Sequence, residues 1–363
     1  MSKPVRIGVI GAGGNTRTRH IPGFKAIPGV EVVAVCNRTL ASGEKVAKEF
    51  GIPKVTDNWK EIVEAPNIDA ICIGTWPNLH GKLTVAALRA GKHVLTEARM
   101  ARNLAEAELM LAESKLHPRL VAQIVPAPLS LPFDATIIDL LQAGTLGTLR
   151  EVFLTATTDG LADSALPLSW RQNLTLSGKN TLYLGIYYEM ILRWLGRAVT
   201  SLVADAAIFS KERKDEEGVP QATTIPESVT VLGSYAAATA PTAATNAPWA
   251  VNWQPTGARL VAHFSGVETS APRAEIRVNG SKGGLRLDLA KGELWLRLRG
   301  EAEKPVVIAP EKRGAWRVEA DFIDSIRDGK PVRLTDFETG VKYMQFTEAV
   351  WESWSNGRWR VTL

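Results

Sequence analysis

The chain has 363 residues, 45% of them hydrophobic, and its 43 basic and 38 acidic residues give a net charge of +5. This length exceeds the roughly 250 to 300 residues at which a single core usually divides, so we expect two domains. The basic residues are spread along the chain, which argues against nucleic acid as a partner. No run approaches the ~18 apolar residues of a membrane span and no signal-peptide pattern opens the chain. The two cysteines, Cys36 and Cys72, lie in apolar stretches. We therefore expect a cytoplasmic protein with no membrane partner and no metal site.

A glycine-rich turn follows the first apolar segment. Residues 5–10, VRIGVI, predict a buried strand, which leads into GAGG at positions 11–14. Gly11 would make the tight turn, and Gly13 would let the backbone approach phosphate oxygens at a helix N-terminus. The third position of the G-x-G-x-x-G pattern is Thr16, so we expect looser contact between helix and strand there. A plain glycine-rich turn is the alternative, but the position after an N-terminal strand favours a nucleotide site.

The residue placed to meet an adenosine ribose is Asn37. It follows the apolar segment 30–36, about 20 positions beyond the glycines, where an acidic residue is typical of NAD sites. A neutral residue with an adjacent arginine leaves room for a 2′-phosphate, and Arg38 is that neighbour. The sequence therefore favours NADP over NAD as cofactor, although Asn37 can also bond a free hydroxyl. Alternatively, Arg38 only stacks on the adenine.

Strand-like and helix-like segments alternate through the first third of the chain. Further strand patterns lie at 30–36, 68–74, 93–96 and 120–125, and helical patterns lie at 40–50, 59–65, 80–90 and 103–115. This alternation predicts an α/β class with a doubly wound parallel sheet, a dinucleotide-binding Rossmann domain over residues 1–122. Loops at the carboxyl ends of parallel strands line the ligand crevice, so the loop 75–80 belongs to the site. Its His80 could equally be a structural residue at the start of the next helix.

The second half of the chain predicts a sheet with helices on one face. Strand patterns lie at 149–157, 228–235, 259–265, 274–278, 285–289 and 293–299, and helical ones at 132–143, 183–197, 316–326 and 335–354. Leucines recur at every second position in the last two strands, as in a half-covered sheet. We expect residues 123–363 to form an α+β domain with a large open, mostly antiparallel sheet. Its other face carries Trp295 and Arg297 and predicts a homodimer or homotetramer interface. The charged run 211–217 is interpreted as a solvated loop, and the low-complexity segment 236–248 as a flexible excursion.

Three ordered motifs resemble those of the Gfo/Idh/MocA family, named after glucose-fructose oxidoreductase and inositol dehydrogenase. GVIGAGGN followed by His20 resembles its glycine motif, TWPNLH resembles its T-P-N-x-x-H, and GKHVLTEARMA resembles its GKHVxxEKPMA. The resemblance continues through residues 144–147, 170–171, the helix around Gly185 and the segment 321–361. It implies an NAD(P)-dependent oxidoreductase of a sugar, glycoside or polyol. The cofactor-binding residues that the motifs and the resemblance indicate are Gly11, Gly13, Gly14, Asn15, Asn37, Arg38, Thr75, Trp76, Asn78, His80, Glu97, Trp170 and Arg171.

The chain departs from the family at the residues that hold and deprotonate the reacting hydroxyl. The lysine after the motif glutamate is Ala98 here, and the proline is Arg99. The family's D-x-G-x-H-x-x-D helix has Tyr183, Tyr187 and Met190 at its three polar positions. Since alanine and methionine cannot accept a proton, the family's usual proton relay is absent.

Tyrosines and an arginine are the candidate replacements. Tyr183 and Tyr187 lie at i and i+4 on one helix face, and a phenol exchanges a proton if a cation such as Arg99 lowers its pKa from about 10. Glu97 and Arg99 project to the same side if their strand stays extended, and with Lys179 as a further cation they would hold a polar or anionic substrate. The alternative is that both tyrosines only pack against tryptophans.

Three functions remain open at this point. The first is net hydride transfer with Tyr187, Tyr183, Glu97 and Arg99 as catalytic residues, and Arg99, Lys179 and both tyrosines at the substrate. The second is redox-neutral, NAD-dependent cleavage of a glycoside. The third is a catalytically inactive nucleotide-binding sensor, which the loss of the family's relay suggests. The convergence of polar residues on one crevice favours an enzyme.

Overall fold

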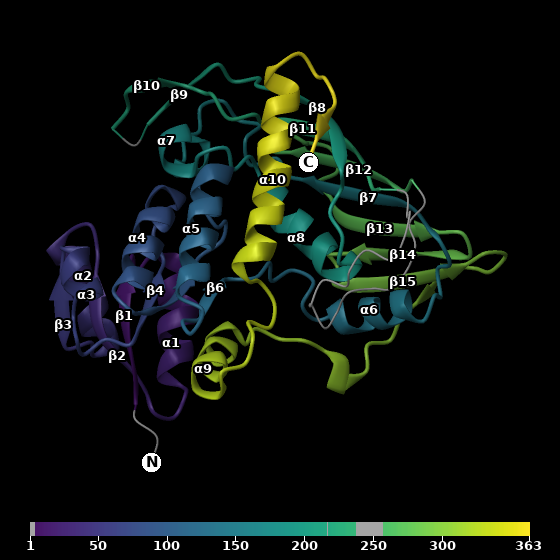
Figure 1. Cartoon of the computed structure of the whole chain (residues 1–363). Coiled ribbons are helices and arrows are strands. Elements are labelled where there is room, and N and C mark those ends of the chain that lie inside the picture. The colour runs from purple at the N-terminus through teal and green to yellow at the C-terminus, as the bar shows by residue number, and fades with distance from the viewer. Residues whose placement is uncertain (1–3, 216, 237–256) are drawn as a thin grey trace. The chain divides into compact units, whose positions relative to one another are not determined.

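The computed structural model describes residues 4–215, 217–236 and 257–363, which form two compact units (Figure 1). The first unit holds the chain up to Pro126, a short segment Thr175–Gly178 and the segment Arg317–Met344. The second holds Ala127–Leu174, Lys179–Trp316 and Gln345–Leu363. The sequence prediction placed one boundary near residue 122 and did not include these two returns of the chain. Of the low-complexity segment 236–248, all but Ala236 lies outside the described residues.

A six-stranded parallel sheet forms the centre of the first unit, which confirms the predicted Rossmann fold. Its central strand β4 is apolar and buried at every position, as a sheet covered on both faces requires. The extra edge strand β3 has only three residues and was not predicted. In spatial order the strands are β3 (Lys54–Thr56), β2 (Val30–Cys36), β1 (Val5–Ile10), β4 (Ala70–Ile73), β5 (His93–Thr96) and β6 (Ala122–Ile124).

The helices of this unit have the terminal signals that the sequence indicates. Thr39 accepts a hydrogen bond from the Ser42 amide at the start of α2, and Gly51 ends that helix in the left-handed region with φ of 64°. The helix after β4 begins at Pro77 and not at His80 as predicted, because proline fits the first helical position. The elements are η1 (Thr16–His20, π-helical), α1 (Ile21–Lys25), α2 (Leu40–Phe50), α3 (Trp59–Val63), α4 (Pro77–Arg89), α5 (Leu104–Leu116) and α9 (Val318–Asp328).

A nine-stranded sheet dominates the second unit and confirms the predicted large, mostly antiparallel sheet. Among its described strands, β12 and β7 are the one pair that runs parallel. Alternate residues such as Leu285 and Leu287 are buried on one face, and Figure 1 shows α6 and α8 next to the sheet. The prediction missed β8 and the short edge strands. In spatial order the strands are β16 (Lys304–Pro305), β15 (Glu293–Leu298), β14 (Gly283–Asp288), β13 (Ala274–Gly280), β7 (Leu149–Thr157), β12 (Arg259–Ser265), β11 (Ser228–Ser234), β8 (Ser201–Ala207) and β17 (Val361–Thr362).

The remaining elements connect or cover these strands. Helix α10 begins among the residues of the first unit and ends among those of the second. The remaining elements are α6 (Asp134–Gln142), η2 (Trp170–Gln172), α7 (Leu174–Ser177), α8 (Leu184–Leu195), β9 (Glu212–Lys214), β10 (Pro220–Ala222), η3 (Pro310–Lys312) and α10 (Phe337–Ser355).

The interpretation of the charged run 211–217 as a solvated loop was wrong for Arg213. This residue lies in β9, is 2% exposed, and pairs with the fully buried Glu227 at 2.8 Å. Its guanidinium also donates to the carbonyl oxygens of Leu161 and Asp163. A charged run does not reveal that one of its members finds a carboxylate distant in sequence, so the sequence could not indicate this core position.

Membrane spans and metal clusters bear directly on function. No helix among the described residues is both long enough and apolar enough to cross a bilayer. No cluster of three or more histidine, cysteine, aspartate or glutamate side chains in the same part of the chain is arranged to hold a metal ion.

Candidate nucleotide-binding site

A pocket of about 540 Å³ lies at the carboxyl ends of the parallel strands in the first unit. The turn after β1, the residues after β2 and the loop after β4 all contribute to it, as expected for this sheet type. The predicted cofactor residues Gly11, Gly13, Asn37, Arg38, Thr75, Trp76 and Asn78 line the pocket together with Ile10, Ala12, Cys36, Ser42, Asp57, Trp59, Gly74, Leu79, Leu83 and Leu176.

The glycine turn leaves its backbone uncovered by side chains. Gly11 has a φ of +86°, and a Cβ there would lie 2.6 Å from the Thr75 amide nitrogen. Only glycine fits this conformation and this close approach. A Cβ at Gly13 would meet nothing nearer than the Gly74 carbonyl oxygen at 3.8 Å, and one at Gly14 nothing within 4 Å. The first glycine therefore makes the turn, and the next two leave open space beside the backbone for an anionic group. The Gly11 and Gly13 amides donate to the carbonyl oxygens of Cys36 and Gly11, so the Gly14 amide is the one that remains for it.

The prediction of loose contact at Thr16 was wrong. Thr16 is 1% exposed, and a Cβ on Gly74 would lie 2.0 Å from its Oγ1 and 2.4 Å from the Gly11 carbonyl oxygen. The helix and strand thus come close because the glycine sits at the end of β4, opposite the threonine. Reading the motif on one strand alone could not reveal this exchange of positions.

Asn37 and Arg38 occupy the ribose end of the predicted site. The Asn37 Oδ1 accepts a hydrogen bond from the Ala12 amide at 2.8 Å, which ties the end of β2 to the glycine turn. With its oxygen engaged, the Asn37 side chain has two N–H donors left to offer. Arg38 lines the same pocket, but so does the carboxylate of Asp57, which the sequence analysis did not single out.

The loop after β4 carries polar atoms that the protein leaves unsatisfied. The Thr75 Oγ1 and the Asn78 Oδ1 are buried and have no hydrogen-bond partner among the described residues. Buried polar atoms normally have partners, so these two are available to a ligand. Together with the bare glycine turn, they fit a dinucleotide bound over the first unit.

His80 supports this loop from inside. It is fully buried, and its Nδ1 and Nε2 each lie 2.9 Å from a carbonyl oxygen, of Arg99 and of Thr75 respectively. The ring thereby fixes the loop after β4 against the segment after β5. This geometry agrees with the structural alternative for His80, while its role as a cofactor ligand stays a prediction.

Three ionisable side chains from distant parts of the sequence meet beside the glycine turn. His20 is 0% exposed; its Nδ1 lies 2.5 Å from Glu319 Oε1, and its Nε2 lies 2.9 Å from Glu97 Oε1. Asn15, at the end of the glycine turn, donates to the same Glu97 oxygen at 2.5 Å. Two carboxylate partners require both ring nitrogens to carry a proton, so His20 is an imidazolium.

The charges of this cluster stabilise one another. Burial disfavours the charged form, but hydrogen bonds to Glu319 and Glu97 outweigh it and raise the pKa of His20 to about 9. Burial likewise acts against ionisation of Glu97, yet the hydrogen bond from His20 holds its pKa below the usual value. Glu97 is therefore a carboxylate at neutral pH, which suits it to accept hydrogen bonds and not to donate a proton.

Arg99 does not lie on an extended strand with Glu97, as the sequence prediction assumed. Strand β5 ends at Thr96, so the alternation of an extended strand does not apply to positions 97–99. Arg99 is 5% exposed, and the next residue, Met100, donates its amide to the Tyr343 hydroxyl at 2.6 Å. The assignment of Arg99 to substrate or catalysis stays a prediction.

The two tyrosines lie at the start of α8 in the second unit and differ in their surroundings. Tyr183 precedes the first helical residue and is 46% exposed, whereas Tyr187 is 6% exposed and packs edge to face on Phe264 with centroids 6.0 Å apart. Leu182, just before them, has a φ of 47°, a strained conformation for a residue with a branched side chain. Burial, with a smaller contribution from Tyr183, raises the pKa of Tyr187 to about 12. The expected lowering of a phenol pKa is thus absent at Tyr187.

The other predicted residues of the second unit have partners within it. The Arg171 guanidinium stacks on the Trp170 ring, 4.3 Å from its centroid, and Lys179 forms an ion pair with Glu348. Their assignment to the cofactor and the substrate stays a prediction.

Comparison with known proteins identifies the family. The family model described as "Oxidoreductase family, NAD-binding Rossmann fold" matches residues 5–123, and the one described as "GFO/IDH/MocA C-terminal domain" matches residues 135–286. Together these matches cover more than half of the chain. The chain belongs to the Gfo/Idh/MocA family. The first unit of this family member is accordingly an NAD-binding Rossmann domain, as the glycine turn predicted.

Individual relatives share about 30% or less of their aligned residues with this chain in the two examples that follow. Levoglucosan dehydrogenase of Pseudarthrobacter phenanthrenivorans is 30% identical over 157 residues, which are 43% of this chain and 40% of the relative. dTDP-3,4-didehydro-2,6-dideoxy-alpha-D-glucose 3-reductase of Streptomyces antibioticus is 27% identical over 344 residues, 92% of each chain. Several curated relatives are matched over about half of their own length or less.

A solved structure supports the fold along the whole chain. Levoglucosan dehydrogenase in complex with NADH and L-sorbose superposes with a TM-score of 0.82 at 20% identity, covering 99% of this chain and 98% of that chain. At that identity the similarity establishes the fold alone.

Sequence reasoning missed several residues of this Gfo/Idh/MocA site. Glu319 follows His20 by 299 positions, and no local pattern links the two residues. Leu176 reaches the pocket because the segment Thr175–Gly178 returns to the first unit. A Cβ on Gly178, whose φ is +67°, would lie 2.1 Å from the Arg102 carbonyl oxygen. Gly178 is the residue in the sequence that could have indicated the close approach of this segment to the backbone of Arg102.

Proposed function

We propose that the protein is an NAD(P)-dependent oxidoreductase that acts on a sugar, glycoside or polyol. The observation that carries this proposal is the pocket of the first unit, where a bare glycine turn faces the unsatisfied oxygens of Thr75 and Asn78. A bound nicotinamide dinucleotide would supply hydride chemistry there. The Gly14 amide would donate to its phosphates beside the open space at Gly13, and Thr75 and Asn78 would orient it.

We propose further that Tyr187 replaces the family's histidine as a proton donor to a substrate oxygen. A phenol whose pKa is raised to about 12 stays protonated at neutral pH and can give its proton to a developing alkoxide. Its hydroxyl has no hydrogen-bond partner among the described residues, so it is available to a ligand. The same pKa makes tyrosinate too rare to act as a base near pH 7. The proposal therefore favours reduction of a carbonyl as the faster direction.

We also propose that Arg38 and Asn37 give the site a preference for NADP. Two donors on Asn37 and the guanidinium of Arg38 suit a 2′-phosphate, whereas the Asp57 carboxylate opposes one. Arg38→Gln should weaken NADPH binding by about tenfold or more, since it removes one charge-assisted hydrogen bond, and should change NADH binding less. Asp57→Asn is the matched control and should improve NADPH relative to NADH.

Two measurements test these proposals. Titration of nicotinamide fluorescence with NADPH and NADH gives both affinities for the wild type and the two variants, and absence of binding for either coenzyme would refute the assignment as a dehydrogenase. A panel of keto-sugars followed at the reduced-nicotinamide band then tests turnover. Release of a free sugar without net absorbance change would instead indicate redox-neutral cleavage.

The role of Tyr187 needs its own control. Tyr187→Phe should lower kcat by about 10² to 10⁴ with coenzyme affinity unchanged. Tyr188→Phe is the matched variant, because the Tyr188 hydroxyl bonds the Val199 amide at 2.8 Å and is buried in the core. It should reduce stability and leave kcat per folded molecule unchanged. Full activity of Tyr187→Phe would refute the proton-donor role.

A further inference from the structure

The His20 side chain links the segment after the glycine turn to two carboxylates from distant parts of the first unit. His20 ends η1, which is π-helical, and π-helical turns are frequent at functional sites. Glu319 reaches the ring from α9 because Gly23 of α1 leaves it room: a Cβ on Gly23 would lie 2.8 Å from the Glu319 carboxylate carbon. The side chains of His20 and Glu319 are only 0% and 5% exposed. The fold thus encloses a histidine and a carboxylate that the proposed chemistry does not use.

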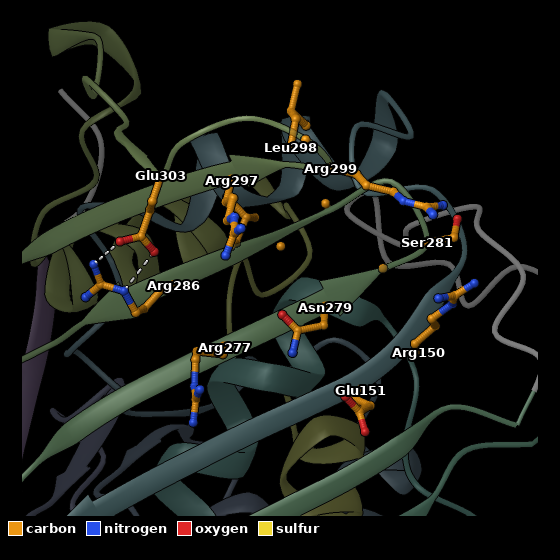
Figure 2. Close-up of a pocket in the computed structure, with 15 residues that line it drawn as sticks. Arg150, Glu151, Arg277, Asn279, Ser281, Arg286, Arg297, Leu298, Arg299 and Glu303 are labelled. Carbon is orange, nitrogen blue, oxygen red and sulfur yellow. Dashed lines mark hydrogen bonds and ion pairs between the residues drawn. The ribbon is translucent and has the colours of Figure 1, made fainter.

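The ion pairs of His20 differ from those at the protein surface. Arg286 and Glu303, on the large sheet, form such a surface pair, with side chains that are 26% and 38% exposed (Figure 2). An exposed pair contributes little, because water solvates either charge when the two separate. In a buried pair each charge fixes the position of the other, since a displaced partner would leave a buried charge unpaired. The His20 imidazolium, held by Glu319, therefore holds the Glu97 carboxylate in one place.

The Glu97 carboxylate uses only one of its oxygens within the cluster. Its Oε1 accepts hydrogen bonds from His20 and Asn15, at 2.9 and 2.5 Å. Its Oε2 has no hydrogen-bond partner among the described residues, and the side chain is still 16% exposed. An ionised carboxylate can accept hydrogen bonds on both oxygens, so Oε2 is available to a ligand.

The order of the strands indicates which part of a dinucleotide this oxygen would meet. Along the carboxyl edge of the sheet, Asn37 follows β2, the glycine turn follows β1, Thr75 follows β4 and Glu97 follows β5. A dinucleotide with its adenosine ribose at Asn37 and its phosphates at the glycine turn would extend its other half toward β4 and β5. That half is nicotinamide riboside, whose ribose hydroxyls and carboxamide can all donate to a carboxylate.

We propose that His20 and Glu319 are positioning residues, which hold the Glu97 Oε2 atom toward the nicotinamide riboside half of the coenzyme. Glu97 accepts hydrogen bonds from the ribose hydroxyls or the carboxamide. His20 is 0% exposed, so it acts through Glu97 and not by contact with the coenzyme. The inference rests on the proposed function, because it requires a coenzyme over the glycine turn.

Isothermal titration of the full chain near neutral pH tests the proposal with three ligands that share their adenosine end. These are NADPH, 2′-phospho-ADP-ribose, which lacks the nicotinamide, and 2′,5′-ADP, which also lacks the second ribose. If NADH is the tighter coenzyme, the series is NADH, ADP-ribose and AMP. We expect Glu97→Gln and His20→Gln each to weaken NADPH binding by about tenfold or more and to leave 2′,5′-ADP binding unchanged, since each disturbs one charge-assisted contact. Weaker binding of 2′-phospho-ADP-ribose identifies the ribose hydroxyls as the donors, and unchanged binding identifies the carboxamide.

A double variant separates positioning from a general effect on the fold. Because His20 acts through Glu97, the double variant with both substitutions should bind NADPH no more weakly than Glu97→Gln alone. Glu113→Gln is the matched control, since Glu113 is a 4% exposed carboxylate of the same unit that binds Arg89 on its surface. Glu303→Gln removes the same charge at the pair shown in Figure 2 and controls for net charge. Both controls should leave the three affinities unchanged.

A milder variant keeps the test valid if His20→Gln folds poorly. Glu319→Gln retains an oxygen that accepts from the His20 ring, so we expect a smaller but equally selective loss of NADPH affinity. Equal weakening of NADPH and 2′,5′-ADP by these variants would show a general loss of structure and overturn the proposal. Additive losses in the double variant, or unchanged NADPH affinity in both His20→Gln and Glu319→Gln, would overturn it as well. A wild-type protein that binds none of the three ligands would instead refute the proposed function, and this inference with it.

Discussion

The buried His20 imidazolium makes the stability of the first unit depend on pH in a defined direction. Its pKa is raised from 6.5 in the unfolded chain to about 9 in the folded one, by hydrogen bonds to Glu319 and Glu97 that outweigh burial. A group whose folded pKa is raised contributes fully below the unfolded value and loses that contribution as pH rises through the folded value. The stabilisation is therefore complete below about pH 6.5 and disappears above about pH 9. A shift of this size corresponds to about 3 kcal/mol.

Urea unfolding between pH 6 and pH 10 measures this contribution. We expect the wild type to lose about 3 kcal/mol more than His20→Gln over that range, since glutamine keeps a donor but carries no charge to lose. At pH 6 the variant should be less stable by a similar amount, because two carboxylates stay buried without their cation. His263→Gln, in the second unit, is the control and should follow the wild-type profile. If unfolding is not two-state, the comparison is made on the transition that His20→Gln shifts.

A direct titration removes any dependence on how the variant folds. The chain has five histidines, so the His20 ring signals can be assigned in an NMR spectrum by their absence in His20→Gln. A midpoint near pH 9 is expected for the wild type. A midpoint at or below 6.5 would refute the charged cluster, and with it the inference that Glu97 is held as a carboxylate beside the glycine turn.

Two further predictions concern packing and buried charge. Gly74→Ala should lower the free energy of unfolding by about 2 to 3 kcal/mol, because its Cβ would lie 2.0 Å from Thr16 Oγ1. Adding Thr16→Gly to the same chain should restore part of that loss in a thermal melt. If the losses of stability of the two single variants simply add in the double variant, the contact is contradicted. Arg213→Met should lower the free energy of unfolding by about 3 to 5 kcal/mol, because Glu227 would remain buried and charged. Adding Glu227→Gln should recover some of that stability in urea unfolding. An unchanged stability of Arg213→Met would show that Arg213 is solvated.

The fold was accessible from the sequence because its signals are local. Apolar runs without alternation marked the buried parallel strands, and leucines at every second position marked the half-covered sheet. The strand predicted at 149–157 coincides with β7, and the one at 259–265 with β12. Strands of two or three residues such as β3 and β16 gave no periodic signal, since alternation needs about four residues to be visible.

The nucleotide pocket was predicted better than the chemistry because its parts follow strands in a fixed order. Each strand end delivers its loop to one edge of the sheet, so Asn37 and Thr75 could be placed from spacing alone. The contacts of Thr16 with Gly74 and of His20 with Glu319 depend on which distant segments pack together. No local sequence pattern specifies that packing, so these contacts could not be predicted.

The ionisation states of Tyr187 and His20 depend on their surroundings in the fold, which a sequence motif does not specify. Resemblance located Tyr187 at the position of the family's histidine, and the sequence suggested a lowered phenol pKa there. Within its own unit Tyr187 is buried against Phe264 and its pKa is raised to about 12, because desolvation disfavours the phenolate. The same desolvation acts on His20, yet there two carboxylates reverse the outcome. Burial alone thus does not set the sign of a pKa shift. The neighbours do, and at Tyr187 the contacts with Phe264 and Tyr183 supply no stabilising cation, so the phenol keeps its proton at neutral pH.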